Sequence, residues 1–139
     1  MNQYPSAAGI IVFQDRSPDS LYFLGLVALP EFQIKNSGIY DIPKGRIDPG
    51  ESPLQCAIRE AREESTIDIT HLDGGPYTYD RLTVWLAESY QDPYIGINPS
   101  TGLKEHLGYE WVQAEKMEAQ CLDYLKPHIR WARKYLGDL

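Results

Sequence analysis

The feature that most constrains the fold of this chain is a helix that the sequence marks clearly at its start. Ser52 is a favourable N-cap residue, Pro53 suits the first helical position, and Gln55 completes a capping box with Ser52. The sequence therefore predicts a helix over about Ser52 to Ser65. At about 100° per residue, one arc of this helix is apolar or small and suits a core; it consists of Leu54, Ala57, Ile58, Ala61 and Ser65.

A neighbouring arc of the same helix is acidic, because Glu60, Glu63 and Glu64 project from it together. Like charges at these spacings repel, at a cost of a few tenths of a kcal/mol per close pair. Hard divalent cations would offset that repulsion, since Mg²⁺ takes carboxylate oxygens together with waters and substrate phosphates. A solvated acidic face has the same short pattern, so the three carboxylates alone leave both interpretations open.

A longer pattern around this helix favours the metal site. It spans Gly45 to Ile67 and is spaced G-x5-E-x7-R-E-A-x-E-E-x-T-I. This pattern resembles the Nudix box, G-x5-E-x7-R-E-U-x-E-E-x-G-U with U apolar, at every fixed position except Thr66. Glycine at that position normally provides a left-handed turn, which a β-branched residue adopts at a cost of order 1 kcal/mol. The departure concerns the helix exit and leaves the acidic positions intact.

The resemblance implies the Nudix fold, an α/β fold with a mixed β-sheet sandwiched between helices, over a single domain of residues 1–139. Hydrophobic patterns agree, since Ala7 to Phe13 and Leu21 to Leu29 indicate a hairpin across the polar segment Gln14 to Ser20. Irregular structure is predicted for Ile42 to Ile47, where Pro43 and Gly45 break any helix. The other expected elements are a loop with a possible short strand at Pro30 to Tyr40, a turn at Asp73 to Pro76, one long or two short strands in Tyr77 to Glu88, a loop at Gln91 to Gly102, a strand at Tyr109 to Gln113, a helix at Ala114 to Gln120 and a terminal helix at Cys121 to Leu136.

The resemblance also implies roles for the box residues. Glu60, Glu63 and Glu64 would hold Mg²⁺ or Mn²⁺, and a backbone carbonyl around Lys44 and Gly45 would complete the site. Glu51 and Arg59 would pair across the loop and the helix and orient the ligands. Family members differ in the general base, which leaves Glu60, Glu64 and the later Glu105 as candidates.

The substrate class is indicated by two further stretches. Pro43-Lys44-Gly45-Arg46 resembles the diadenosine tetraphosphate hydrolases and the catalytic domain of messenger-RNA decapping enzymes. The stretch E-H-x-x-Y-x-W, from Glu105 to Trp111, is similar to the animal-type diadenosine tetraphosphate hydrolases. Lys44 and Arg46 would meet phosphates as charged donors, or lie in a solvated turn. His106 and Tyr109 belong to the substrate-binding candidates, and a satisfied structural histidine is the alternative for His106.

Tyrosine is abundant, with ten residues in the chain. Tyr77 and Tyr79 are candidates for stacking on a base, a contact worth roughly 1 to 3 kcal/mol. Packing within the sheet, with the hydroxyl at the surface, is the alternative for both.

The charge balance limits the partners. The formal net charge of -7 argues against a protein that coats DNA, RNA or a membrane through a basic surface, although an RNA 5' end stays possible. No apolar run approaches the roughly 18 residues that span a bilayer. Cys56 and Cys121 lack zinc-like spacing and are too few for a disulfide framework, so we expect a reducing compartment and a cytoplasmic location. The expected assembly is a monomer or a homodimer.

The expected function is therefore a metal-dependent Nudix pyrophosphohydrolase that cleaves a nucleoside diphosphate linked to another moiety. The preferred substrate is a dinucleoside polyphosphate, with diadenosine tetraphosphate cut into ATP and AMP. The alternatives are a pyrophosphohydrolase of RNA 5' ends or caps, of diphosphoinositol polyphosphates, of ADP-ribose or nicotinamide dinucleotides, or of noncanonical nucleotides. A catalytically silent nucleotide-sensing module is the alternative from another class, and the retained Glu51, Glu60, Glu63 and Glu64 argue against it.

Overall fold

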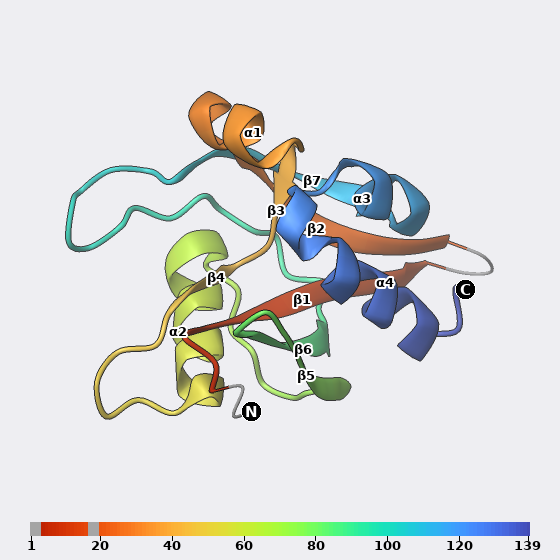
Figure 1. Cartoon of the computed structure of the whole chain (residues 1–139), viewed down its shortest axis with the longest axis horizontal. Coiled ribbons are helices and arrows are strands. Elements are labelled where there is room, and N and C mark those ends of the chain that lie inside the picture. Colours follow the sequence, from red (N-terminus) through yellow and green to blue (C-terminus); the bar gives the residue numbers. More distant parts are fainter. Residues whose placement is uncertain (1–3, 17–19) are drawn as a thin grey trace.

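A mixed seven-stranded sheet forms the centre of the computed structural model, which describes residues 4–16 and 20–139 (Figure 1). The main path runs β3-β2-β1-β6-β5, while β4 pairs with β1 and β7 pairs with β2. The strands are β1 (Ala7–Arg16), β2 (Ser20–Ala28), β3 (Tyr40–Asp41), β4 (Lys44–Arg46), β5 (Gly74–Tyr79), β6 (Leu82–Glu88) and β7 (His106–Gln113). β1 and β6 are parallel, and the other pairs are antiparallel.

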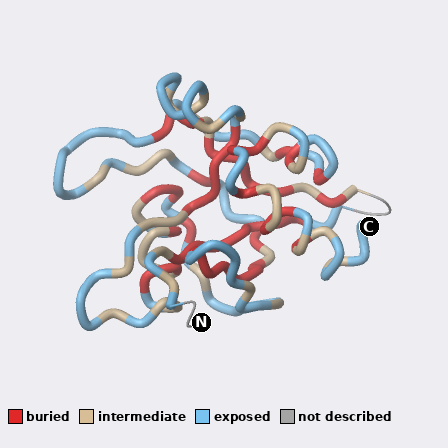
Figure 2. Tube along the Cα trace, viewed as in Figure 1, coloured by how far each residue is buried: buried red, intermediate tan, exposed pale blue. Residues whose placement is uncertain are grey.

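Helices cover both faces of this sheet, as predicted. Alternate residues of β1 point to opposite sides: Ile10 packs with the core under α2 (Pro53–Ser65), and Ile11 packs with the core on the other face. That second face is covered by α3 (Ala114–Gln120) and α4 (Lys126–Tyr135). β1 is buried along most of its length and lies at the middle of the buried layer (Figure 2).

The box helix α2 forms as the sequence predicts. Ser52 Oγ accepts from the Gln55 backbone N–H at 3.1 Å, and Gln55 Oε1 accepts from the Ser52 N–H at 2.9 Å, which completes the capping box. Thr66 ends the helix in the left-handed region, with φ 61° and ψ 13°. The box position that holds Thr66 in this chain therefore has a left-handed backbone, which glycine adopts without strain.

The hairpin of β1 and β2 is confirmed by its antiparallel register, in which Phe13 faces Phe23. β1 extends through Arg16, beyond the predicted end at Phe13, and residues 17–19 of the expected turn lie outside the described residues. β6 and β7 and the helix α3 also match their predicted segments within a few residues. Both cysteines are buried free thiols.

Four expected elements were wrong in detail. The segment Ile42 to Ile47, expected to be irregular, contains the short strand β4 paired with β1. The loop predicted at Pro30 to Tyr40 contains a helix, α1 (Pro30–Asn36), whose Pro30 occupies a permitted first-turn position. No residue of α1 is buried, so the helix has no apolar periodicity to reveal it.

The turn predicted at Asp73 to Pro76 is mostly strand, because β5 is an edge strand with a bulge between Gly74 and Tyr77 that accommodates Pro76. The predicted terminal helix starts later than Cys121. A 3₁₀ turn, η1 (Asp123–Leu125), precedes α4, and Pro127 lacks the N–H that a longer helix would need. Among the described helices, none has both the length and the apolar character needed to cross a bilayer.

Candidate active site

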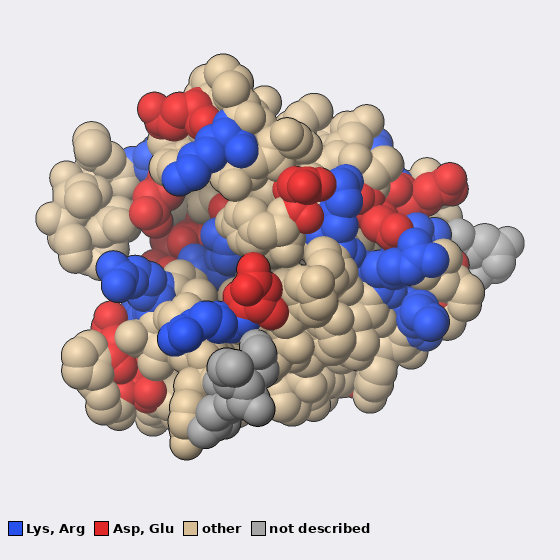
Figure 3. All heavy atoms as spheres, viewed as in Figure 1, with Lys and Arg blue, Asp and Glu red and all other residues tan. Residues whose placement is uncertain are grey.

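One cavity of about 1020 Å³ lies beside the acidic edge of α2. Charged side chains of both signs surround a hollow on this side of the molecule (Figure 3). Six carboxylates line the cavity: Asp41, Asp48, Glu60, Glu63, Glu64 and Glu105. Four cationic side chains accompany them: Lys35, Lys44, Arg46 and Arg59. The walls therefore carry more negative than positive groups.

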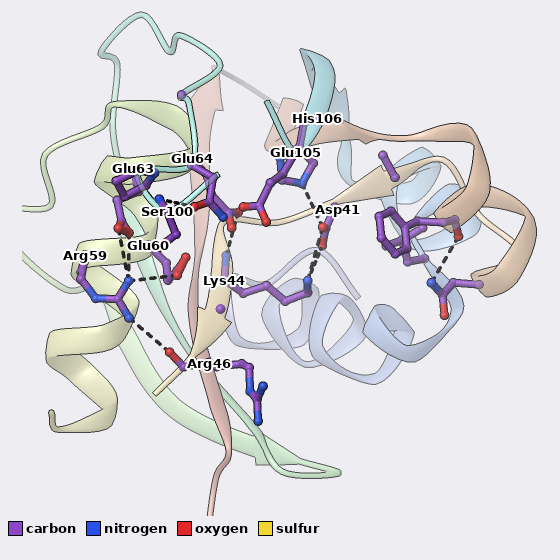
Figure 4. A pocket seen from close by; sticks show the side chains of 18 of the residues that line it. Asp41, Lys44, Arg46, Arg59, Glu60, Glu63, Glu64, Ser100, Glu105 and His106 are labelled. Carbon is purple, nitrogen blue, oxygen red and sulfur yellow. Dashed lines mark hydrogen bonds and ion pairs between the residues drawn. The ribbon is translucent and has the colours of Figure 1, made fainter. Parts of the chain in front are cut away.

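Arg59 organises one end of the cavity. Its Nε donates to Glu51 Oε2 at 2.7 Å and its Nη2 donates to Glu51 Oε1 at 3.0 Å, which is the predicted pair. The hydrogen bond from Arg59 lowers the pKa of Glu51 to about 2. Arg59 Nη1 also donates to Glu60 at 3.1 Å and to Glu63 at 2.9 Å (Figure 4). One guanidinium thus fixes three carboxylates relative to the loop before α2.

The short strand β4 crosses the acidic edge of α2. The Lys44 backbone N–H donates to Glu64 Oε1 at 3.2 Å, and Gly45 lies against the carboxylate of Glu60 so closely that a side chain on Gly45 would overlap it. Burial, reinforced by the charge of Asp41, raises the pKa of Glu64. Burial also raises the pKa of Glu60, in spite of the attraction of Arg59. These two carboxylates are therefore costly to ionise without added positive charge.

The carboxylates beside the cavity fit a hard divalent cation, although in this structure they form hydrogen bonds to protein groups. Within residues 4–16 and 20–139 no three acidic, histidine or cysteine groups are already gathered as a metal cluster. Arg59 holds Glu60 and Glu63, and the Lys44 N–H holds Glu64. Oxygen donors on one helix edge, in a cavity with an excess of carboxylates, suit Mg²⁺ or Mn²⁺.

A second network joins two predicted site residues, Lys44 and His106, through Asp41, which was not among the predicted residues. The side chain of Asp41 is 10% exposed. Asp41 lies 3.2 Å from Lys44 Nζ and 3.0 Å from His106 Nε2 (Figure 4). Burial by itself would raise the pKa of Asp41, but Lys44 and His106 outweigh it and the pKa lies below its ordinary value. The same Asp41 charge, against the opposing effect of burial, raises the pKa of Lys44.

The segment between β6 and β7 closes another side of the cavity. The Tyr94 N–H donates to the Ser65 carbonyl at 2.9 Å, and the Gly96 N–H donates to the Glu64 carbonyl at 3.0 Å. A side chain on Gly96 would overlap the Glu63 carbonyl. The segment is thus attached to the end of α2 that carries the acidic residues.

Most of the predicted site residues meet in this cavity. Lys44, Gly45 and Arg46 of β4 line it, as do Glu105 and His106. Glu105 is exposed and points toward Glu64 in Figure 4. His106 is buried, and its Nε2 is taken by Asp41. One ring nitrogen of His106 thus has a structural hydrogen-bond partner, as the alternative interpretation predicts.

The predicted tyrosines lie elsewhere. Tyr77 stacks on Trp131 of α4 with ring centroids 5.0 Å apart and an interplanar angle of 10°. Tyr79 meets the edge of His128 in the same cluster. Neither tyrosine belongs to the described lining of the cavity, because β5 is the far edge strand and packs on α4. Tyr109, in the middle of β7, is also outside the lining.

Two other aromatic residues line the cavity. Phe32 of α1 is 45% exposed, and Tyr124 of η1 lies with its ring centroid 5.3 Å from Lys44 Nζ. No sequence pattern indicates Phe32, because α1 lies in a segment that the sequence predicts to be a loop. Asp41 stands three residues before Lys44, and this position beside the P-K-G stretch is the sequence feature that could have indicated it as a site residue.

Comparison with known proteins agrees with the geometry of the site. The family model described as the NUDIX domain matches residues 3–135. The chain belongs to the Nudix family. It is a Nudix pyrophosphohydrolase, a hydrolase that acts on phosphorus-containing anhydrides, and its mixed sheet between helices is the Nudix fold.

Similar Nudix proteins include the asymmetrical bis(5'-nucleosyl)-tetraphosphatase of Sus scrofa, 32% identical over 124 residues that cover 76% of this chain and 77% of that protein. The NAD-capped RNA hydrolase NudC of Escherichia coli O157:H7 is 28% identical over 97% of this chain, and the match covers 48% of that enzyme. A crystal structure of a C. elegans Ap4A hydrolase binary complex covers 96% of this chain and 98% of its own, with TM-score 0.70 and 23% identity. This last likeness concerns the fold.

Proposed function

We propose that this Nudix protein is a divalent-metal-dependent hydrolase of dinucleoside polyphosphates that cuts diadenosine tetraphosphate asymmetrically into ATP and AMP. The observation that carries the proposal is the cavity whose lining combines the acidic edge of α2 with Lys44 and Arg46. The similarity to the pig asymmetrical tetraphosphatase, whose match covers three quarters of this chain, supports the substrate class.

The metal would be held by Glu60, Glu63 and Glu64, with a backbone carbonyl around Lys44 and Gly45. A bound Mg²⁺ or Mn²⁺ supplies charge neutralisation at the diphosphate and activation of the attacking water. The chain itself provides the orientation: Arg59 holds the carboxylates of Glu60 and Glu63, and β4 fixes that of Glu64. Glu60, Glu64 and Glu105 remain the candidates for the general base.

The phosphates would be bound by Lys44 and Arg46. Lys35, on α1, also lines the cavity and has no ion-pair partner among the described residues. A free ammonium beside the cavity suits a polyphosphate chain longer than a single diphosphate. This extra cationic position favours a tetraphosphate over a short nucleotide.

The adenine would stack on Phe32 or Tyr124, the aromatic residues that line the cavity. Stacking on an aromatic ring contributes roughly 1 to 3 kcal/mol per base. With one adenosine anchored, the metal would meet the phosphate chain at a fixed distance, which gives unequal products.

Hydrolysis of a modified RNA 5' end is the second candidate, favoured by the similarity to NudC over 97% of this chain. An assay with Mg²⁺ and chromatographic separation of products distinguishes the two. It should compare diadenosine tetraphosphate, NAD-capped RNA, triphosphorylated RNA and a diphosphoinositol polyphosphate. We expect the highest kcat/KM for diadenosine tetraphosphate, with ATP and AMP as products. A preference for any of the others would refute the substrate assignment and leave the reaction class intact.

A further inference from the structure

We propose that Asp41 is a positioning residue, which holds the Lys44 ammonium and the His106 ring together at the phosphate-binding wall of the cavity. The proposal rests on the proposed function for the identity of the bound groups. Asp41 would contact neither substrate nor metal and would act through its two neighbours (Figure 4).

Three strands bring these residues together. Asp41 ends β3, Lys44 begins β4 and His106 begins β7. Asp41 is paired with Leu26 of β2, and His106 is paired with Ala28 two residues along the same strand. The side chains of Asp41 and His106 therefore meet across β2, where the small Ala28 leaves room beside the cavity.

Both carboxylate oxygens of Asp41 bind protein groups. Its Oδ1 accepts from the Ile42 N–H at 2.8 Å and lies 3.2 Å from Lys44 Nζ. Its Oδ2 accepts from Lys44 Nζ at 3.3 Å and lies 3.0 Å from His106 Nε2. A buried carboxylate that is hydrogen-bonded on both oxygens is poorly placed to bind a metal directly.

With Asp41 bound to both side chains, Lys44 and His106 each keep one hydrogen-bonding group that can face the cavity. An ammonium has three N–H donors, so Lys44 keeps a donor for phosphate while Asp41 fixes the direction of its side chain. A carboxylate is an acceptor, and it therefore selects the His106 tautomer with the proton on Nε2. His106 Nδ1 is then an acceptor, and it makes no hydrogen bond to the described residues. A water molecule or a ribose hydroxyl could donate to it.

The kinetic test uses Asp41→Asn, with Glu110→Gln as the matched control. Glu110 also accepts from a neighbouring side chain, Tyr40 at 2.9 Å, but lies outside the described lining of the cavity. With whichever diphosphate the wild type hydrolyses best, Asp41→Asn should raise KM by about 10- to 100-fold and change kcat less. The Glu110→Gln variant should retain both constants.

A double-mutant cycle separates positioning from a general loss of folding. Lys44→Met should also raise KM, and the double variant should cost less than the product of the separate effects, because Asp41 acts partly through Lys44. If Asp41→Asn does not fold, a second cycle of His106→Gln with Lys44→Met tests whether the two side chains that Asp41 joins are coupled, and the double variant should again cost less than the product of the separate effects. Independent, fully multiplicative effects would refute the proposal.

A spectroscopic measurement without metal or nucleotide completes the test. In ¹H–¹⁵N spectra of the imidazoles, His106 should be the Nε2–H tautomer in wild type and in Glu110→Gln, and it should change in Asp41→Asn. An unchanged tautomer, or a lowered KM in Asp41→Asn, would overturn the positioning role. If the wild type hydrolyses none of the tested diphosphates, the proposed function fails, while the tautomer still decides whether Asp41 orients His106.

Discussion

The carboxylate of Glu60 lies directly against the Cα of Gly45, the middle residue of β4, where that strand crosses α2. The contact leaves no room for a β-carbon, so the glycine of the box is required by the position of an acidic side chain. Close approach of this kind, and not a left-handed backbone, is the physical reason for glycine here.

Gly45→Ala should lower kcat/KM by at least about tenfold, since misplacement of a catalytic group by about 1 Å can cost as much as 100-fold. The fold should survive, because the end of the Glu60 side chain can move aside. Gly108→Ala on β7 is the control, since its β-carbon would meet nothing within 4 Å. Wild-type rates in Gly45→Ala would show that Glu60 needs no fixed position.

Glu63→Gln and Glu64→Gln should each lower turnover by at least about 100-fold, because the charge that holds the metal is lost. The Glu64 variant should stay folded, since an amide oxygen can still accept from the Lys44 N–H. Glu115→Gln, at an exposed position of α3, is the control. A chelator should abolish wild-type activity and Mg²⁺ should restore it; near-wild-type rates in both variants would contradict the assigned ligands.

Phe32→Ala should raise KM for diadenosine tetraphosphate more than it lowers kcat, as expected when stacking contributes uniform binding. The loss of roughly 1 to 3 kcal/mol corresponds to about a 5- to 150-fold change in KM. Ile34→Ala is the matched control on the same helix, because Ile34 is 83% exposed and outside the described lining. Equal effects of the two substitutions would place the base elsewhere.

Thr66→Gly should be more stable than Thr66→Ala by about 1 kcal/mol, because only glycine is free of strain at this left-handed position. Against wild type, Thr66→Gly should gain up to about 1 kcal/mol. Both substitutions remove Thr66 Oγ1, which accepts a hydrogen bond from the Tyr94 N–H at 3.2 Å. The Tyr94 N–H keeps its other hydrogen bond, to the Ser65 carbonyl. Urea unfolding measures both differences, and a clear loss in the glycine variant would contradict the assigned strain.

His128 should make stability fall on mild acidification. Its side chain is buried against the Leu82 carbonyl at 3.0 Å, and burial lowers its pKa below the ordinary value of 6.5. Because the unfolded chain takes up this proton first, the contribution to the free energy of unfolding is complete above about pH 6.5 and decreases below it. Urea unfolding of His128→Gln between neutral and acidic pH should show a shallower decrease than wild type.

The parts of the fold that the sequence predicted are those with a local cause. The capping residues and the apolar arc define α2, and alternating or continuous apolar runs define β1, β2 and β6. The helix α1 has no buried face, and β5 contains a bulge at Pro76, so neither has the pattern on which the prediction depends.

The site was predictable where its residues belong to one segment. Glu51, Arg59, Glu60, Glu63 and Glu64 lie on or beside α2, and the spacing of the box identifies them together. The contacts of Asp41 with His106, and of Tyr124 with Lys44, join segments that are far apart in the chain. Only tertiary packing brings them together, so the sequence offers Tyr77 and Tyr79 as base-stacking candidates and does not indicate Phe32 or Tyr124, which line the cavity.

The attachment of Tyr94 and Gly96 to the last turn of α2 divides the following segment into two parts with different tolerance of change. Backbone hydrogen bonds fix the first part to the helix that carries the acidic residues. Beyond it, the chain folds back at the bridge between Ile97 and Lys104, and Asn98, Pro99 and Ser100 reach the cavity wall. Insertions or substitutions between Ile97 and Lys104 would therefore reshape the entrance of the cavity, while the positions of the carboxylates on α2 stay unchanged. A family that conserves its chemistry and varies its substrates can diversify through such a segment, and an engineer can randomise it for the same purpose.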